Sequence, residues 1–262
     1  MKEEILFEKR KKRGEVDKNF IAKFADLNFP DLIKLLDDKD AQKRSVAAIL
    51  IGKRNNKEAV EVLIKRLKKE KALYTKINIC DSLVSCEEKT ISYLIDIIGE
   101  TGKNQHSELP EKGFYKSSYP LPRDIAARTL VRMGSGVLKC LSERVDDTDE
   151  NKLTEMIDII GHISFYSEDK SFENKLHNLF QKNKSNLVLQ WKIICSFQGF
   201  NTNRTRSFLE EIIFNSEIKQ FKWEALRCLL IQDKTISEKL RSFVLSSGDE
   251  ELINVFKWFN KK

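Results

Sequence analysis

Two tryptophans with neighbouring lysines are the residues best suited to recognition chemistry in this 262-residue chain. Trp191 is followed by Lys192, and Trp223 is preceded by Lys222. Indole rings beside cations can stack on nucleic-acid bases or form the centre of a protein interface. The other interpretation is that both rings fill seams between helices, and the sequence leaves both open.

Basic residues recur at equivalent positions of a repeat and could form a ladder along one surface. Such a ladder could contact the phosphates of a nucleic acid. It could equally consist of structural ion pairs, since Asp40 lies four residues before Arg44 on the same predicted helix. The members of the ladder are Arg44, Lys76, Arg123 and Lys222.

A second recurring position holds Asp81, Arg128 and Asp158, each on the second helix of three successive repeats. Their alternating sign predicts lateral ion pairs, which contribute little when they are exposed. The functional alternative is that Asp158 lies in a concave pocket. Both interpretations follow from the same spacing.

Residues 101–121 have no helical pattern and many aromatic side chains. A loop of about 20 residues inside a compact repeat is often functional or disordered. Phe114, Tyr115 and Tyr119 are its candidates for contact, either with the chain's own helices or with a partner.

Motifs for catalysis and metal binding are absent from the sequence. It has no phosphate-binding glycine loop, zinc-protease motif or serine-nucleophile motif. Its five cysteines have no CxxC spacing, so we expect reduced thiols. The N-terminus does not resemble a signal peptide, and no apolar stretch is long enough to cross a bilayer. We therefore predict a cytoplasmic protein without cofactor, metal, catalytic residues or membrane contact.

These residues must be positioned by helices, because apolar residues recur at helical spacing along nearly the whole chain. Each repeat is expected to contain two helices, and we call the position near the end of its second helix the anchor. Apolar residues one, four and five positions before the anchor share a face, which a neighbouring helix must cover. The anchors are Gly52, Val84, Val131, Gly161, Gln198 and Leu230.

Shorter amphipathic segments precede the second helices and complete a series of helix hairpins. A covering helix at about 15–28 and a last pair at 236–245 and 250–260 protect the ends. Asp40 and Asp149 end acidic connections and can cap the helices that follow them. We expect an all-α chain with one domain over residues 1–262, made of about six to seven hairpins. The first helices are expected at 32–36, 60–67, 91–98, 137–145, 172–180 and 208–214.

Residues 40–52 read DAQKRSVAAILIG and resemble the HEAT-like repeat, in which Asp, Arg, two small residues and Gly recur, as in repeats of the phycobilin-lyase type. Residues 122–130, PRDIAARTL, are similar. The resemblance implies a right-handed α-α superhelix, an armadillo-like solenoid whose second helices line the concave face. It transfers no activity, because one fold serves many functions.

The formal net charge of +7 and the pI near 9.0 suit nucleic acid or an acidic protein, or simply a soluble lysine-rich surface. Our leading expectation is a monomeric, non-enzymatic scaffold that binds a protein through the concave face. The architecture also resembles that of HEAT-like alkylpurine DNA glycosylases, which implies damaged-base binding by a set of side chains. That set is Trp191, Trp223, Asp158, Arg128 and Lys192. A phycobilin-lyase-like function rests on the repeat similarity alone.

Overall fold

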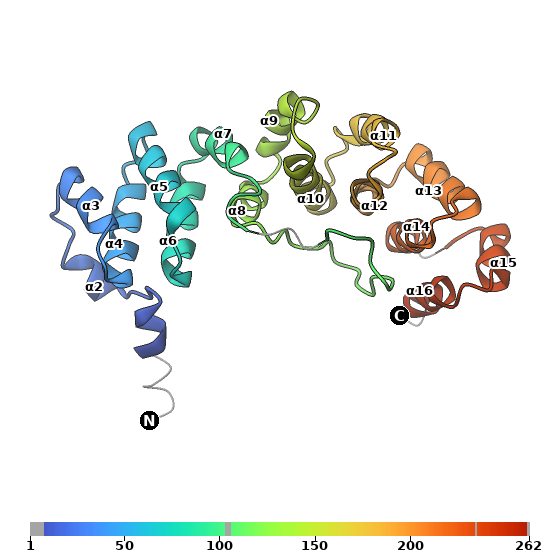
Figure 1. Cartoon of the computed structure of the whole chain (residues 1–262), viewed down its shortest axis with the longest axis horizontal. Coiled ribbons are helices and arrows are strands. Elements are labelled where there is room, and N and C mark those ends of the chain that lie inside the picture. Colours follow the sequence, from blue (N-terminus) through green and yellow to red (C-terminus); the bar gives the residue numbers. More distant parts are fainter. Residues whose placement is uncertain (1–7, 103–105, 234, 261–262) are drawn as a thin grey trace. The chain divides into compact units, whose positions relative to one another are not determined.

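The structure, a computed structural model, describes residues 8–102, 106–233 and 235–260. Within these ranges the chain forms helices and no strand (Figure 1), so the all-α prediction is confirmed. The chain divides into two compact units. Unit 1 comprises residues 1–103 and 124–140, and unit 2 comprises residues 104–123 and 141–262.

Unit 1 has two layers of helices. The second helices α4 (Ala41–Gly52), α6 (Leu73–Ser85) and α8 (Ile125–Met133) pack in a row. The first helices α3 (Phe29–Leu36), α5 (Lys57–Lys69) and α7 (Glu88–Asp96) pack against them. Ala47, Ile79 and Leu130 from the expected apolar stripes are completely buried, so the stripes form the core between the layers.

Unit 2 repeats the two-layer arrangement. Its second helices α10 (Glu150–Ser167), α12 (Leu187–Ser196), α14 (Lys219–Gln232) and α16 (Glu250–Asn260) pack in a row. The helices α11 (Glu173–Lys182), α13 (Asn203–Asn215) and α15 (Glu238–Ser246) cover them, and the short 3-10 helix η1 (Phe197–Gly199) extends α12. Helix α9 (Gly136–Arg144) precedes α10 in the sequence.

The expected caps are confirmed at two helix starts. The Asp40 carboxylate accepts a hydrogen bond from the Gln42 amide, and Asp149 accepts one from the Lys152 amide. Each cap satisfies an amide that the first turn of a helix leaves without a backbone partner. The acidic connections therefore fix where α4 and α10 begin.

The structure differs from the sequence-based boundaries at two places. The covering helix expected at about 15–28 is only α2 (Lys18–Ala22), and α3 begins separately after it, with Asn28 as its N-cap and a proline in its first turn. Helix α10 continues past Gly161 to Ser167, so Gly161 lies inside the helix rather than at its end.

Among the residues covered by the structure, none of the helices combines the length and the apolar character that crossing a bilayer requires.

Candidate functional site

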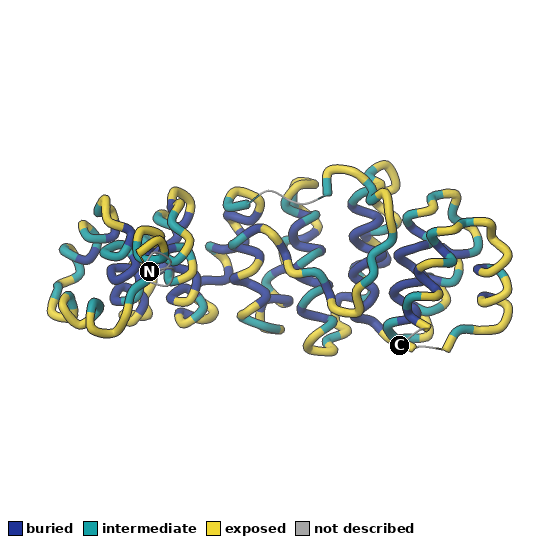
Figure 2. Tube along the Cα trace, turned by 90° about the horizontal axis from the view of Figure 1, so that it is seen from below, coloured by how far each residue is buried: buried dark blue, intermediate teal, exposed yellow. Residues whose placement is uncertain are grey.

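A strap, which we define as residues 106–121, lies along the second helices of unit 2 (Figures 1 and 2). His106 packs edge-on against Trp191 of α12, with ring centroids 4.9 Å apart. Tyr115 packs against Trp258 of α16, at 6.2 Å. The loop that we expected to contact either its own helices or a partner therefore packs on its own helices.

Side chains from the second helices hold the main chain of the strap. Arg227 of α14 donates from Nη1 to the Lys116 carbonyl at 3.0 Å, and its guanidinium lies 5.1 Å from the Phe114 ring centroid. Gln198 donates from Nε2 to the Ser117 carbonyl at 3.1 Å. Because these bonds go to backbone atoms, they fix the path of the strap.

Glu251 of α16 holds the turn of the strap farthest from α10. Its Oε1 atom accepts a hydrogen bond from the Gly113 amide at 2.7 Å and another from the Tyr115 hydroxyl. Burial, together with that carboxylate, raises the pKa of Tyr115 to about 12. A Cβ atom at position 113 would overlap Val255, so only glycine allows this close approach.

Tyr119 anchors the other end of the strap on α10. Its side chain is buried against Phe165 and His162, with ring centroids 6.2 Å and 6.0 Å away. A Cβ atom at Gly161 would overlap the Tyr119 hydroxyl, so the glycine provides the space that the ring occupies. The strap is therefore anchored on the helices of unit 2, with Tyr119 as its buried residue.

The two indoles proposed as a recognition surface are buried. Trp191 is 8% exposed and Trp223 is 7% exposed, and Trp223 donates from Nε1 to Asp249 at 2.9 Å. The Nζ atom of Lys222 lies 5.6 Å from the Phe243 ring, where a cation is attracted to the ring face. The tryptophans therefore fill seams between helices and do not form an exposed surface on which bases could stack.

Lys192 and Asp158 form an ion pair between α12 and α10. Lys192 is buried, so its ammonium group needs this carboxylate to offset the loss of hydration. Burial, followed by the charge of Lys192, lowers the pKa of nearby His106. Asp158 is therefore a structural partner of Lys192 rather than an acid in an open pocket.

The predicted lateral ion pairs are present in unit 1 with a different partner. Asp81 of α6 pairs with Arg132 of α8 at 2.7 Å, one helical turn beyond Arg128. Arg128 is exposed on α8. Arg123, which belongs to unit 2, is also exposed.

A buried Arg227–Glu224 pair was missed by sequence reasoning. Both side chains lie on α14, and Arg227 Nε is 3.0 Å from each Glu224 carboxylate oxygen. Arg227 also donates to the Gln198 carboxamide oxygen at 2.8 Å. Burial alone would lower the pKa of Arg227, but the Glu224 carboxylate outweighs burial and raises it. Only the i, i+3 spacing could have indicated the pair.

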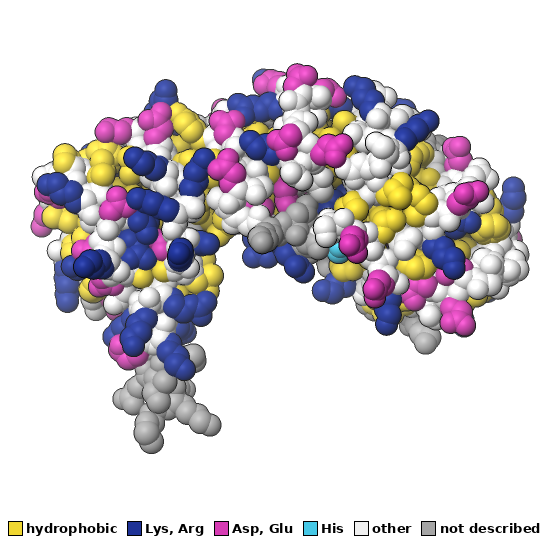
Figure 3. Space-filling view, in the orientation of Figure 1, with side chains coloured by type: hydrophobic (Ala, Val, Ile, Leu, Met, Phe, Trp, Pro, Cys, Tyr) yellow, Lys and Arg dark blue, Asp and Glu magenta, His cyan; other side chains and the backbone are white. Residues whose placement is uncertain are grey.

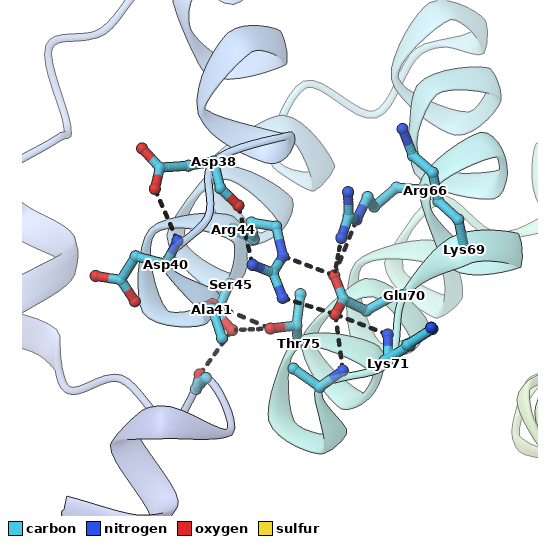
Figure 4. A network of polar contacts seen from close by, with 12 residues as sticks. Asp38, Asp40, Ala41, Arg44, Ser45, Arg66, Lys69, Glu70, Lys71 and Thr75 are labelled. Carbon is cyan, nitrogen blue, oxygen red and sulfur yellow. Dashed lines mark hydrogen bonds and ion pairs between the residues drawn. The ribbon is translucent and has the colours of Figure 1, made fainter.

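Glu70 is the centre of a polar network in unit 1 (Figure 4). Its carboxylate accepts bonds from Arg44 Nε and Nη2 and from Arg66 Nε, each at 2.9 Å, and from the Ala72 amide at 2.8 Å. Asp40 caps α4 instead of pairing with Arg44. This first member of the basic ladder is therefore a structural cation.

Replacing Glu70 with glutamine should destabilise the chain by roughly 2 kcal/mol at neutral pH, since hydrogen bonds to the charged group are lost. Burial would raise the pKa of Glu70, but the bonds from Arg44, the Ala72 amide and Arg66 lower it from 4.5 to about 2. The stabilisation should therefore be complete above about pH 4.5 and disappear as the pH falls towards 2. Urea unfolding followed by circular dichroism at several pH values measures this. A difference from Glu70→Gln that stays constant between pH 7 and pH 3 would contradict it.

Nucleophilic and metal-binding chemistry has little support in the described parts of the chain. No three His, Cys, Asp or Glu residues gather there in a way that could hold a metal ion. The five cysteines are free thiols, and burial raises the pKa of Cys80, Cys195 and Cys228. A raised pKa keeps a thiol protonated and a poor nucleophile.

Buried or partly buried charged side chains in both units have partners within the chain. Arg227, Lys192 and Glu70 each pair with a charged side chain of the same chain. Unit 2 also binds the extended strap through the backbone and aromatic rings of the strap.

No protein-family model matches this chain, and a search of curated proteins finds no match.

Proposed function

We propose that this chain is a non-enzymatic solenoid of HEAT-like helix hairpins that binds a segment of a partner protein along its second helices. The strap carries this proposal. Side chains of α14 and α16 and the Gln198 side chain bond to its main chain, and aromatic rings pack around its side chains. Proteins that recognise extended peptides combine backbone hydrogen bonds with side-chain pockets in the same way.

The helix arrangement supports the HEAT-like part of the proposal. In each unit a row of second helices packs side by side and is covered by first helices, as stacked helix hairpins require. The segment that most resembles a HEAT-like repeat forms α4, with Asp40 as its N-cap and Gly52 as its last residue. A Cβ atom at Gly52 would overlap Ser82 of α6, so the glycine allows the second helices to approach closely.

The buried residues favour a scaffold over a DNA glycosylase-like enzyme. Such an enzyme would need accessible aromatic rings and a carboxylate free to stabilise developing positive charge. Trp191 and Trp223 are buried, and Asp158 is engaged by Lys192. Nothing in the described residues favours a bilin pocket, so the phycobilin-lyase-like alternative keeps only the repeat similarity.

Cross-linking mass spectrometry tests protein binding on the second helices. Tagged full-length chain, cross-linked through lysines in cells of its source and then purified, should show partner peptides attached to Lys76 of α6. Lys65 of α5 is the matched control, because it lies in the same unit on a first helix. If no partner peptide is attached, or if all partner links map to first-helix lysines such as Lys65, the proposal is wrong.

Nucleic-acid binding is the second candidate, because unit 1 carries the whole formal net charge of +7 while the charges of unit 2 cancel. Charge alone supports only non-specific association, which weakens steeply with salt. We expect a labelled DNA duplex to bind at about 50 mM salt and to dissociate by about 200 mM, as fluorescence anisotropy would show. Binding that persists at the higher salt and is lost in Arg128→Ala would favour the nucleic-acid function instead.

A further inference from the structure

One face of α6 in unit 1 carries an exposed stripe, which we define as Leu73, Ile77 and Asp81. These residues are spaced by four positions and therefore lie along one side of the helix. Leu73 is 40% exposed and Ile77 is 41% exposed, whereas Ile79 and Leu83 on the other side are completely buried. Leu73 and Ile77 therefore lie next to each other as exposed aliphatic side chains on one side of α6.

In unit 2 the corresponding side of the second helices is covered. Every residue from Leu189 to Ser196 of α12 is buried, and so is every residue from Trp223 to Leu230 of α14. Their outward side chains contact the strap, as Trp191 contacts His106 and Arg227 contacts Lys116. In Figure 2 the second helices of unit 2 are blue along much of their length. By comparison, Leu73 and Ile77 of the α6 stripe are exposed.

Cations surround the stripe within unit 1. The Tyr74 amide donates to the Arg13 carbonyl at 2.9 Å, and the Arg13 guanidinium lies 5.9 Å from the Tyr74 ring, which places Arg13 at the first turn of α6, where Leu73 also lies. Lys76 precedes Ile77 directly, and Arg132 reaches Asp81 at the far end. Figure 3 shows Lys and Arg side chains gathered over unit 1 and over the segment that precedes α2.

We infer that the stripe and the cations beside it, Arg13 and Lys76, dock an acidic amphipathic segment of the partner protein. Two apolar residues of the segment would cover Leu73 and Ile77, and its carboxylates would lie beside the cations. This inference rests on the proposed protein-binding function and adds the place and the chemistry of the bound segment. Complementary charge would also speed association and select against basic partners.

The apolar centre of the stripe favours a protein over a nucleic acid. Nucleic-acid grooves combine rows of cations with exposed aromatic rings that stack on bases. Here the centre is aliphatic, and the neighbouring Tyr74 ring already contacts Arg13. Burying Leu73 and Ile77 yields free energy only against another apolar surface.

The test is anisotropy titration of three labelled peptides of about 18 residues with the full-length chain. The first is an acidic amphipathic helix with leucines spaced by three and four positions among glutamates. In the second, lysine replaces every glutamate, and in the third, serine replaces every leucine. The first peptide should bind at least about tenfold more tightly than either control, and more weakly as salt increases. Equal binding of the three peptides, or no binding of the first, overturns the inference.

Variants locate the site. Ile77→Glu should weaken binding of the first peptide by about tenfold or more, because it removes apolar area and adds a repelling charge. Leu187→Glu on α12 is the matched control, since Leu187 is also 41% exposed, and it should change binding less than about twofold. Unchanged thermal unfolding shows that both variants fold. Normal binding by Ile77→Glu overturns the inference, as does a DNA duplex that binds more tightly than the peptide and is lost in the same variant. Cross-links to Lys76 without peptide binding would reject the acidic segment alone, whereas absence of any cross-linked partner rejects the protein-binding function.

Discussion

Replacing Glu224 with alanine is expected to destabilise unit 2 by about 3–5 kcal/mol, the usual cost of removing one partner of a buried ion pair. Arg227 is completely buried, and Glu224 is the carboxylate that contacts its guanidinium from one turn earlier on α14. Without Glu224, the remaining bonds to the Gln198 and Lys116 oxygens would not neutralise the cation. Tryptophan fluorescence during urea unfolding measures the loss, because all three tryptophans belong to unit 2.

The double variant Glu224→Leu, Arg227→Met separates the charge effect from packing. It removes both charges and fills much of the same volume, so it should cost less than Glu224→Ala alone. If Glu224→Ala costs less than about 1 kcal/mol, water reaches Arg227 and the pair is not buried as described.

Most of the helix hairpins follow from local sequence. The last helix was expected at 250–260, and α16 has those bounds. The apolar stripe that predicts a helix is a property of residues three and four positions apart, so it can be read without knowing the partner helix. Caps such as Asp40 and Asp149 are equally local.

The candidate site depended on contacts that are distant in sequence and could not be read in this way. Gly161 resembled a helix end because glycine often follows helices. Its actual role is to admit Tyr119, which is far away in the sequence. The tryptophans had cationic neighbours suited to recognition, but the strap covers Trp191 and Asp249 holds Trp223. The exposure of the second helices in unit 2 depends on where the strap lies. The strap has no helical periodicity, so its path could not be predicted from the sequence pattern.

Replacing Tyr119 with alanine should cost about 3–5 kcal/mol of unit 2 stability, because the large side chain is buried and its removal leaves a cavity. Tyr119→Phe is the matched control. It keeps the ring and removes only a hydroxyl that has no hydrogen-bond partner, so its effect should stay within about 0.5 kcal/mol. Both are measured by tryptophan fluorescence during urea unfolding.

Gly161→Ala approaches the same contact from α10, since the added methyl group would overlap the Tyr119 hydroxyl. It should cost about 1–3 kcal/mol, as overpacking a filled core does. Combining it with Tyr119→Ala should cost less than the sum of the single effects, because the smaller side chain makes room for the methyl group. A strap that only rests on the surface would give costs below about 0.5 kcal/mol for the single variants and no coupling between them. Strong coupling would mean that Tyr119 and Gly161 contact each other in the folded protein, so that this end of the strap is held on α10.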